Sequence, residues 1–232
     1  MISILVALIL SMTSHLLAAT VDHPHPYKQA EINHIYNLLF ADDINLLRSN
    51  DKPPKNSPLE VLLASKPDPT TVQKLATDQS QESRVRLLAF SWLRLNNVTI
   101  PDKKKLLGVV VEVPLNGSLD VLAAYEDNRV RYINQSEKIA ILESAPPEMA
   151  AKVRELLSVS QKVVDRHAPA NKKRVLPPGQ GNIRLNFLAS DGLYVSEGGF
   201  SAMQKDGLTG PVVQKATDLL VLVTRLGGKP SK

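Results

Sequence analysis

Histidine is the first residue type to consider for chemistry, because imidazole serves both as a metal ligand and as a general base. His23 and His25 form a His-x-His pair, with a proline on each side of His25 that keeps the stretch extended. No acidic cluster nearby completes a tetrahedral ligand set. His34 and His167 fall in predicted helices, where each is expected at the surface or its boundary rather than as a base. We therefore expect neither a metal site nor a cofactor.

Two familiar motifs for covalent catalysis and metal-assisted hydrolysis are missing from the chain. It contains no Gly-x-Ser-x-Gly elbow and no His-Glu-x-x-His. Gly179 and Gly181 lack the third glycine and the following helix of a dinucleotide-binding loop. A triad assembled from distant positions stays open, since triads are defined by geometry rather than by sequence order.

A pair of carboxylates is the remaining source of catalysis. Glu112 lies between two valines in a predicted strand, so it is either a buried carboxylate or one on the outer face of an edge strand. Glu197 closes another predicted strand. Glycoside hydrolysis uses two carboxyl groups about 5 to 10 Å apart. The pair therefore predicts, as an alternative function, a hydrolase that acts on cell-wall or exported substrates.

Two groups of residues form the candidate binding site. The first is a basic group with one aromatic side chain, of the kind that binds polyanions, and consists of Arg129, Arg131, Tyr132, Lys172, Lys173 and Arg174. The second is a turn that could act as a recognition loop, formed by Glu197, Gly198 and Gly199. A structural role stays open for both groups. Arg129 and Arg131 alternate with apolar neighbours as a sheet with one solvated face requires, and glycine pairs are common in turns.

The composition is that of a folded globular protein. The 232 residues are 43% hydrophobic and 22% charged, which excludes a disordered chain and leaves room for one large domain or two small ones. The net charge of +5 favours anionic partners. The chain has no cysteine, which excludes disulfides, thiolate metal sites and a cysteine nucleophile.

The first 19 residues have the pattern of a cleavable export signal. An apolar run over residues 2–10 is followed by polar residues and then by Ala18 and Ala19, after either of which cleavage would fit. No lysine or arginine precedes the run, and an uncleaved membrane anchor is the alternative. With the absence of cysteine, the signal predicts a bacterial periplasmic or secreted protein that has no membrane span after cleavage.

Residues 27–100 are predicted to form a helical segment. Apolar residues recur there at helical spacing, and Ser57 followed by Pro58 and Glu60 has the form of a helix start with a capping box. Asp68 before Pro69 repeats the device of a cap followed by proline.

Residues 105–228 are predicted to form an α+β domain. The period of apolar residues changes to that of strands, and Asn116-Gly117 has the form of a type I′ hairpin turn. We expect a four-stranded antiparallel meander, a long helix from Pro147 to about His167, a β-hairpin that turns at Asp191-Gly192, and a C-terminal helix. The fold class is thus α+β, with a helical N-terminal segment and a two-layer domain.

The sequence favours a non-enzymatic envelope protein that binds a protein partner, such as an inhibitor, an immunity protein or an accessory subunit. This hypothesis rests on the export-signal pattern, the two-part architecture and the missing catalytic motifs. Two alternatives stay open, the hydrolase and a basic surface that binds lipid or an anionic glycan. Nucleic acid is disfavoured as a partner because the protein is expected outside the cytoplasm.

Overall fold

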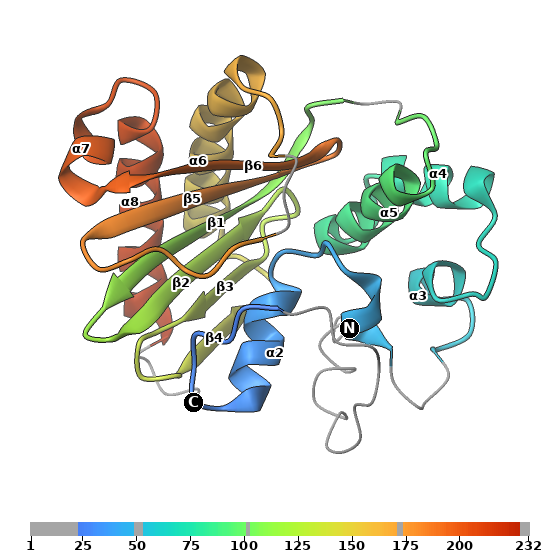
Figure 1. Ribbon diagram of the computed structural model, residues 1–232, viewed down its shortest axis with the longest axis horizontal. Helices are drawn as coiled ribbons and strands as arrows, with labels where there is room; N and C mark the ends of the chain where they lie inside the picture. Colours follow the sequence, from blue (N-terminus) through green and yellow to red (C-terminus); the bar gives the residue numbers. More distant parts are fainter. Residues whose placement is uncertain (1–22, 49–52, 101–102, 171–173, 228–232) are drawn as a thin grey trace.

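The computed structural model describes residues 23–48, 53–100, 103–170 and 174–227. The expected export signal therefore lies outside the described residues, as do Lys172 and Lys173 of the basic group. Within the described residues the chain forms helices on both sides of one antiparallel sheet (Figure 1). The α+β fold class predicted from the sequence is confirmed.

The sheet has six strands in the order β4-β3-β2-β1-β5-β6. The strands are β1 (Leu106–Leu115), β2 (Ser118–Tyr125), β3 (Val130–Ile133), β4 (Ile139–Leu142), β5 (Asn182–Ala189) and β6 (Gly192–Gly199). The predicted meander of four strands is present, and so is the predicted hairpin. Because β5 pairs with β1, the hairpin extends the same sheet, which has six strands rather than four. β4 and β6 are its two edges.

Turn chemistry fixes the register of the central strands. Asn116 and Gly117 both have positive φ, 51° and 77°, as a type I′ turn requires, and they set Leu115 opposite Ser118. Asn128 also has positive φ, at the turn that leads to β3. Gly108 in β1 lies at a position without room for a larger side chain, because a Cβ there would lie 2.8 Å from the Tyr125 ring.

One face of the sheet packs against α6 (Pro147–Arg166) and α8 (Gly210–Gly227), which lie behind the strands in Figure 1. The predicted long helix is present, and the face toward the sheet consists of these six buried residues: Met149, Val153, Leu156, Ser160, Val163 and Val164. α7 (Phe200–Lys205) connects β6 to α8. The sheet and these helices form the two layers expected of the α+β domain.

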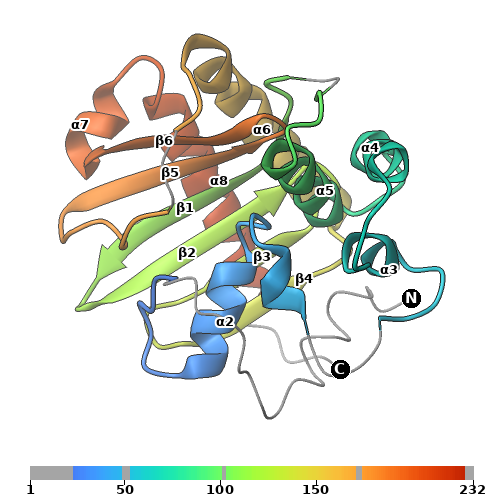
Figure 2. The same ribbon diagram turned by 45° about the vertical axis from the view of Figure 1, so that its right-hand side comes forward.

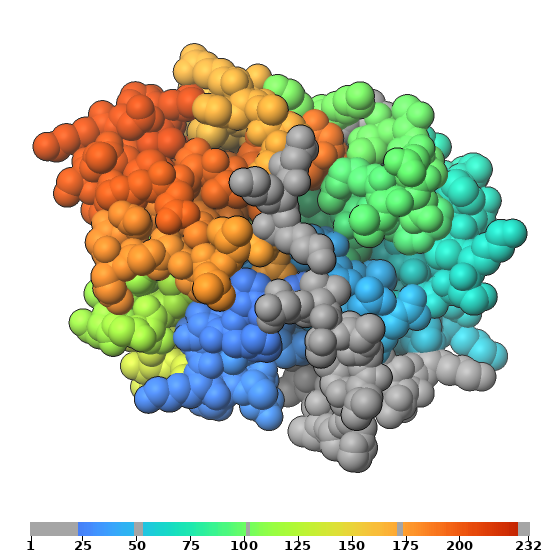
Figure 3. Space-filling view, viewed as in Figure 1, coloured from blue at the N-terminus to red at the C-terminus, as the bar shows by residue number. Residues whose placement is uncertain are grey.

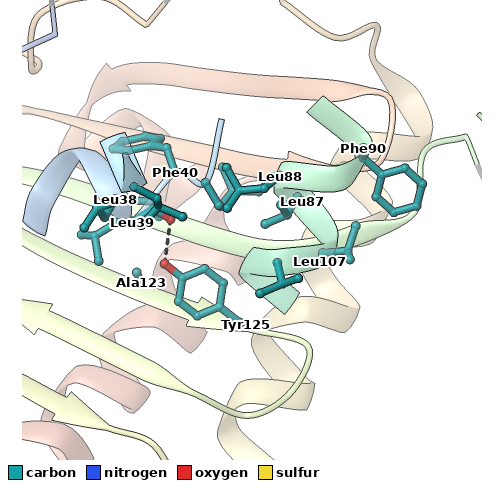
Figure 4. Packing of buried hydrophobic residues seen from close by; sticks show 14 of the residues in the cluster. Leu38, Leu39, Phe40, Leu87, Leu88, Phe90, Leu107, Ala123 and Tyr125 are labelled. Carbon is teal, nitrogen blue, oxygen red and sulfur yellow. Dashed lines mark hydrogen bonds between the residues drawn. The ribbon is translucent and has the colours of Figure 1, made fainter. Parts of the chain in front are cut away.

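The other face of the sheet packs against the N-terminal helical segment, which adds a third layer. Its elements are α2 (Ala30–Leu38), the 3₁₀ helix η1 (Ile44–Leu47), α3 (Pro58–Leu62), α4 (Pro69–Thr77) and α5 (Ser83–Leu95). Side chains of this layer and of the sheet form one continuous buried cluster (Figure 4). Tyr125 on β2 donates a hydrogen bond of 2.7 Å to the Leu39 carbonyl just after α2. The helical segment and the sheet therefore share a core.

The predicted helix starts are present with one difference. The Ser57 hydroxyl accepts from the Glu60 amide at 3.3 Å, and Asp68 accepts from the Thr71 amide at 2.8 Å. Glu60, however, accepts from the amide of Asn56 rather than from that of Ser57. The glutamate of the predicted capping box thus accepts from an amide one residue earlier than expected. The helix itself, α3, is short.

Candidate functional site

The candidate site is built around Glu112, a carboxylate in the middle of the central strand β1. Its side chain lies on the face that packs against the N-terminal helices, and Glu112 is 0% exposed. The alternative of an outward position on an edge strand is excluded, because β1 has a strand on each side. A carboxylate buried this deeply needs hydrogen-bond donors or a cation nearby.

Three side chains supply that compensation. Tyr36 on α2 donates from its hydroxyl to Oε1 of Glu112 at 2.6 Å, and Asn186 on β5 donates from Nδ2 to Oε2 at 2.7 Å. Nη1 of Arg184 lies 3.6 Å from Oε2. Burial, and then the charge of Glu112, raise the pKa of Tyr36 well above its ordinary value, so the phenol stays protonated as a donor.

Arg184 lies between Glu112 and Glu197 in a row across three strands. Glu112 is opposite Arg184 in the β1–β5 register, and Arg184 is opposite Glu197 in the β5–β6 register. The guanidinium contacts Oε2 of Glu197 at 2.8 Å. The two carboxylates proposed for hydrolysis thus lie on one face, but a buried arginine separates them and binds both. Glycoside hydrolysis would require the substrate to lie between the two carboxylates, where the structure has the Arg184 guanidinium.

A cavity of about 160 Å³ opens beside this row, at the edge of the sheet. We call it the edge cavity, and its lining residues are Tyr36, Phe40, Glu112, Ala170, Arg174, Val175, Arg184, Asn186, Leu193 and Val195. Its inner wall is polar and carries the Glu112 network. Its rim is apolar and exposed, with Val175 58% and Val195 42% exposed and the neighbouring Leu176 73% exposed. Such a combination of apolar rim and placed polar groups is typical of binding sites.

Arg174 closes one side of the edge cavity. Its guanidinium lies over the Phe40 ring at 4.1 Å and contacts Asp42 at 2.7 Å and Asn37 at 2.9 Å. It also lies 3.2 Å from Nδ1 of His23. In the space-filling view the surface of α2, in blue, borders the segment that begins at Arg174, in orange (Figure 3). Arg174 therefore ties this segment to the N-terminal layer and does not belong to a solvated basic surface.

The other described residues of the predicted basic group lie elsewhere. Arg131 is only 2% exposed and pairs with Glu143, because its face of β3 is covered by the N-terminal helices instead of solvent. Arg129 binds the same Glu143 at 2.8 Å. Tyr132 lies on the opposite face and donates to Asp120 at 2.8 Å. These residues share no partner with Arg174, so the structure does not bring the basic group together.

The predicted recognition turn is the end of an edge strand. Glu197 and Gly198 belong to β6 and pair with Arg184 and Ile183, and Gly199 is the last residue of the strand, directly before α7. The sequence places the strand end at Glu197, because two consecutive glycines are unfavourable within a strand. Of the candidate groups, Arg174 and Glu197 are therefore near the edge cavity, while Arg129, Arg131 and Tyr132 are not.

Sequence reasoning missed Tyr36, Arg184 and Asn186. Arg184 and Asn186 alternate with apolar residues, a pattern typical of a strand with one solvated face, yet they are 5% and 2% exposed. Polar and apolar residues do alternate between the two faces of β5, but α2 and the segment around Arg174 cover the polar face. The available signal in the sequence was a glutamate within one apolar strand together with two polar residues that alternate with apolar ones in another strand.

Two of the described histidines, His23 and His167, make hydrogen bonds within the protein. Nε2 of His23 lies 3.1 Å from Asp43, and Nδ1 of His167 lies 2.8 Å from the carbonyl of Val163. Burial, and then the charge of His23, lower the pKa of His34. Within residues 23–48, 53–100, 103–170 and 174–227, no three metal-ligating side chains come together.

Comparisons with known proteins add no relative. No protein-family model matches the chain. Neither comparison with curated proteins nor comparison with solved structures finds a match. Among the helices that the structure describes, none is both long and apolar enough to cross a bilayer.

Proposed function

We propose that the protein is an exported, non-enzymatic protein of the cell envelope that binds a protein partner at the edge cavity. The observation that carries this proposal is the contrast within the cavity. Its charged groups are bound to one another in the interior, whereas its rim exposes Val175 and Val195 to solvent. The site thus offers apolar contact area around a network of charged groups that bind one another.

The state of Glu112 supports a binding role over hydrolysis. A general acid or base must be free to exchange a proton with substrate. Both oxygens of Glu112 already accept hydrogen bonds from protein side chains, and Arg184 holds Glu197. Such a satisfied network gives rigidity to a surface, and it uses both oxygens of Glu112 as acceptors for the protein's own side chains.

The apolar rim supports a protein partner. Val175 and Val195 are both exposed and line one cavity, and the exposed Leu176 follows Val175 in the chain. Grouped apolar residues of this kind mark interaction sites more often than single ones do. A partner that covers them would gain free energy from the apolar area removed from water. Export rests on the sequence alone, on the apolar run before Ala18 and Ala19 and on the absence of cysteine.

The first experiment is a native pull-down of the tagged protein from envelope and periplasmic fractions, with mass spectrometry of all species. Wild type is compared with the double variant Val175→Asp, Val195→Asp. Leu95→Asp is the matched control, because Leu95 is an exposed apolar residue, 77% exposed, at the end of α5. We expect a stoichiometric protein partner that survives moderate salt, is lost with the double variant and is kept with the control.

The same sample tests export. The N-terminal peptide of the purified protein should begin after Ala18 or Ala19. A full-length N-terminus in the cytoplasmic fraction would contradict export. Partner loss with Leu95→Asp but not with the double variant would contradict the site.

A further inference from the structure

The outward main chain of β6 can be assigned from its hydrogen bonds. In an antiparallel strand the main-chain groups of successive residues point alternately to one side and the other. The carbonyl of Leu193 accepts from the amide of Ala170 at 2.6 Å and therefore points away from β5. By alternation, the amide and carbonyl groups of Val195 and Glu197 also point outward, beyond the edge of the sheet.

Among the residues that the structure describes, this edge has no strand partner along residues 195–199. Within the described part of the chain, no backbone hydrogen bond reaches the outward groups of Val195 or Glu197. Natural edge strands are usually protected by lysine, proline or short length. β6 is eight residues long and contains neither lysine nor proline, and it is the outermost strand of the sheet in the turned view (Figure 2).

The glycines at the end of β6 widen the access. Gly199 is exposed, and a Cβ built on it would meet no atom within 4 Å. Glycine within a strand weakens it but permits close approach of another backbone. Gly199 therefore leaves the main chain of the edge unshielded where a second strand would lie.

The open edge and the edge cavity are adjacent. Val195 has its main chain on the open edge and its side chain in the cavity lining. Glu197, 34% exposed, offers the next side chain on the same face. Both contacts from Arg184 use Oε2 of Glu197, and no described residue donates to Oε1.

We propose that β6 binds an extended segment of the partner as an additional strand along residues 195–199. The segment places an apolar side chain opposite Val195, at the mouth of the edge cavity, and a lysine or arginine opposite Glu197, where it binds Oε1. This inference rests on the proposed function and names the form of its partner. Main-chain hydrogen bonds supply affinity, and the two side chains supply specificity.

The probe is a phage-displayed library of random nine-residue peptides, panned on the mature protein. Enriched peptides should share an apolar residue two positions from a lysine or arginine, because alternate residues of a strand face the same side. The most enriched peptide is then synthesised, and its dissociation constant is measured by fluorescence anisotropy. Enrichment of no peptide, or of peptides without this pattern, would overturn the proposal.

The decisive variant is Val195→Pro, which removes an outward amide while leaving the pairing with β5 intact. We expect binding at least about tenfold weaker, from the lost hydrogen bond and the clash of the ring. Ile141→Pro is the matched control on the other edge. The Asn134 amide donates to the Lys138 carbonyl, so by alternation the amide of Ile141 points away from β3. Wild-type affinity in Val195→Pro would overturn strand addition.

A second test needs no change in the protein. N-methylation of the peptide, one residue at a time, should weaken binding at every second position and leave the others unchanged, because only alternate amides of an added strand face β6. Equal effects at all positions would contradict a strand. This test applies even where a proline variant fails to fold.

The charge pair is tested by a double-mutant cycle. Glu197→Gln and replacement of the basic peptide residue by glutamine should each weaken binding, and together by less than the product of the two. We expect a coupling of up to about fivefold, as for opposite charges across adjacent strands. A coupling factor of one would mean that the two changes act independently. The proposed pairing of Glu197 with a lysine or arginine of the partner would then be wrong.

The alternative to a partner segment on the edge of β6 is a second copy of the chain. Sedimentation of the mature protein alone should give a monomer, whereas a dimer that Val195→Pro dissociates would replace the proposed partner by self-association. The two proposals can fail separately. If the native partner is lost with Val175→Asp, Val195→Asp but kept with Val195→Pro, partner binding holds and strand addition is wrong.

Discussion

At the scale of single residues, the site depends on how a buried carboxylate is satisfied. Glu112 has no contact with solvent, and its partners come from α2 and β5. Tyr36, Arg184 and Asn186 line the inner wall of the edge cavity. Through Tyr36 this network also joins the N-terminal layer to the sheet. Removing one partner therefore leaves a buried charge less well compensated instead of merely deleting a contact.

Tyr36→Phe tests this compensation. It removes the hydroxyl that donates to Glu112 at 2.6 Å and preserves the ring. We expect a loss of about 1.5–3 kcal/mol in the free energy of unfolding, as for hydrogen bonds to charged groups, measured by urea denaturation. Tyr132→Phe, which removes a hydrogen bond to the part-buried Asp120, is the control and should cost less. Equal costs would contradict a special role for Glu112.

Asp68 gives a pH-dependent prediction. Hydrogen bonds from Thr71 lower the pKa of this cap carboxylate below its ordinary 3.8 in the folded protein. Its contribution is therefore present above the pKa of the unfolded state and is lost as the pH falls through the lower folded pKa. The stability difference between wild type and Asp68→Asn should be largest near neutral pH and vanish in strong acid, as measured by urea denaturation at several pH values. A difference that grows in acid would contradict the assignment.

At the scale of elements, Gly108 shows how a strand adapts to the layer above it. A Cβ at this position would lie 2.8 Å from the Tyr125 ring and 3.2 Å from the Ala124 carbonyl. Tyr125 is fixed in turn by its hydrogen bond to Leu39. The ring therefore has little freedom to move away.

Gly108→Ala should thus be destabilising although alanine favours strands more than glycine does. We expect a loss of about 1–3 kcal/mol from overpacking, measured by thermal or urea unfolding. Gly179→Ala is the control, because a Cβ at Gly179 meets nothing within 4 Å. A Gly108→Ala variant as stable as wild type would show that the Tyr125 ring yields easily.

Local signals predicted the elements well. Asn116-Gly117 specified a hairpin because both residues tolerate positive φ, and the apolar face of α6 followed from helical spacing. Alternation along β3 and β5 was also correct as a pattern. It could not tell whether the polar side of Arg131 or Arg184 faces water, since that depends on a separate layer of helices. The site was missed for that reason: α2 contributes Tyr36 from a distant part of the sequence.

At the scale of the whole molecule, the N-terminal segment and the α+β part share one buried cluster. The boundary near residue 102 is therefore a change of secondary structure and not a division of the core. We expect the mature protein to unfold in a single cooperative transition, with coincident changes in circular dichroism and Trp92 fluorescence. Trp92 lies on α5 and reports the N-terminal layer. Two separated transitions would contradict a shared core.

The same three-layer arrangement explains why the edge cavity exists. The N-terminal helices share a buried cluster with the sheet, and the segment around Arg174 contacts Asn37 and Asp42 of the N-terminal layer. The cavity lies where these two coverings meet the edge strand. No single segment of the sequence contains enough of it to be recognised as a site.

The most direct test of partner binding at this cavity is the recovery of a native partner by three proteins: wild type, Val175→Asp with Val195→Asp, and Leu95→Asp. We predict that wild type and Leu95→Asp bring down the same stoichiometric partner at moderate salt, and that the double variant, folded by circular dichroism, does not. Equal recovery by the double variant would contradict the edge cavity as the binding site. Absence of any partner with wild type would contradict the binding function itself.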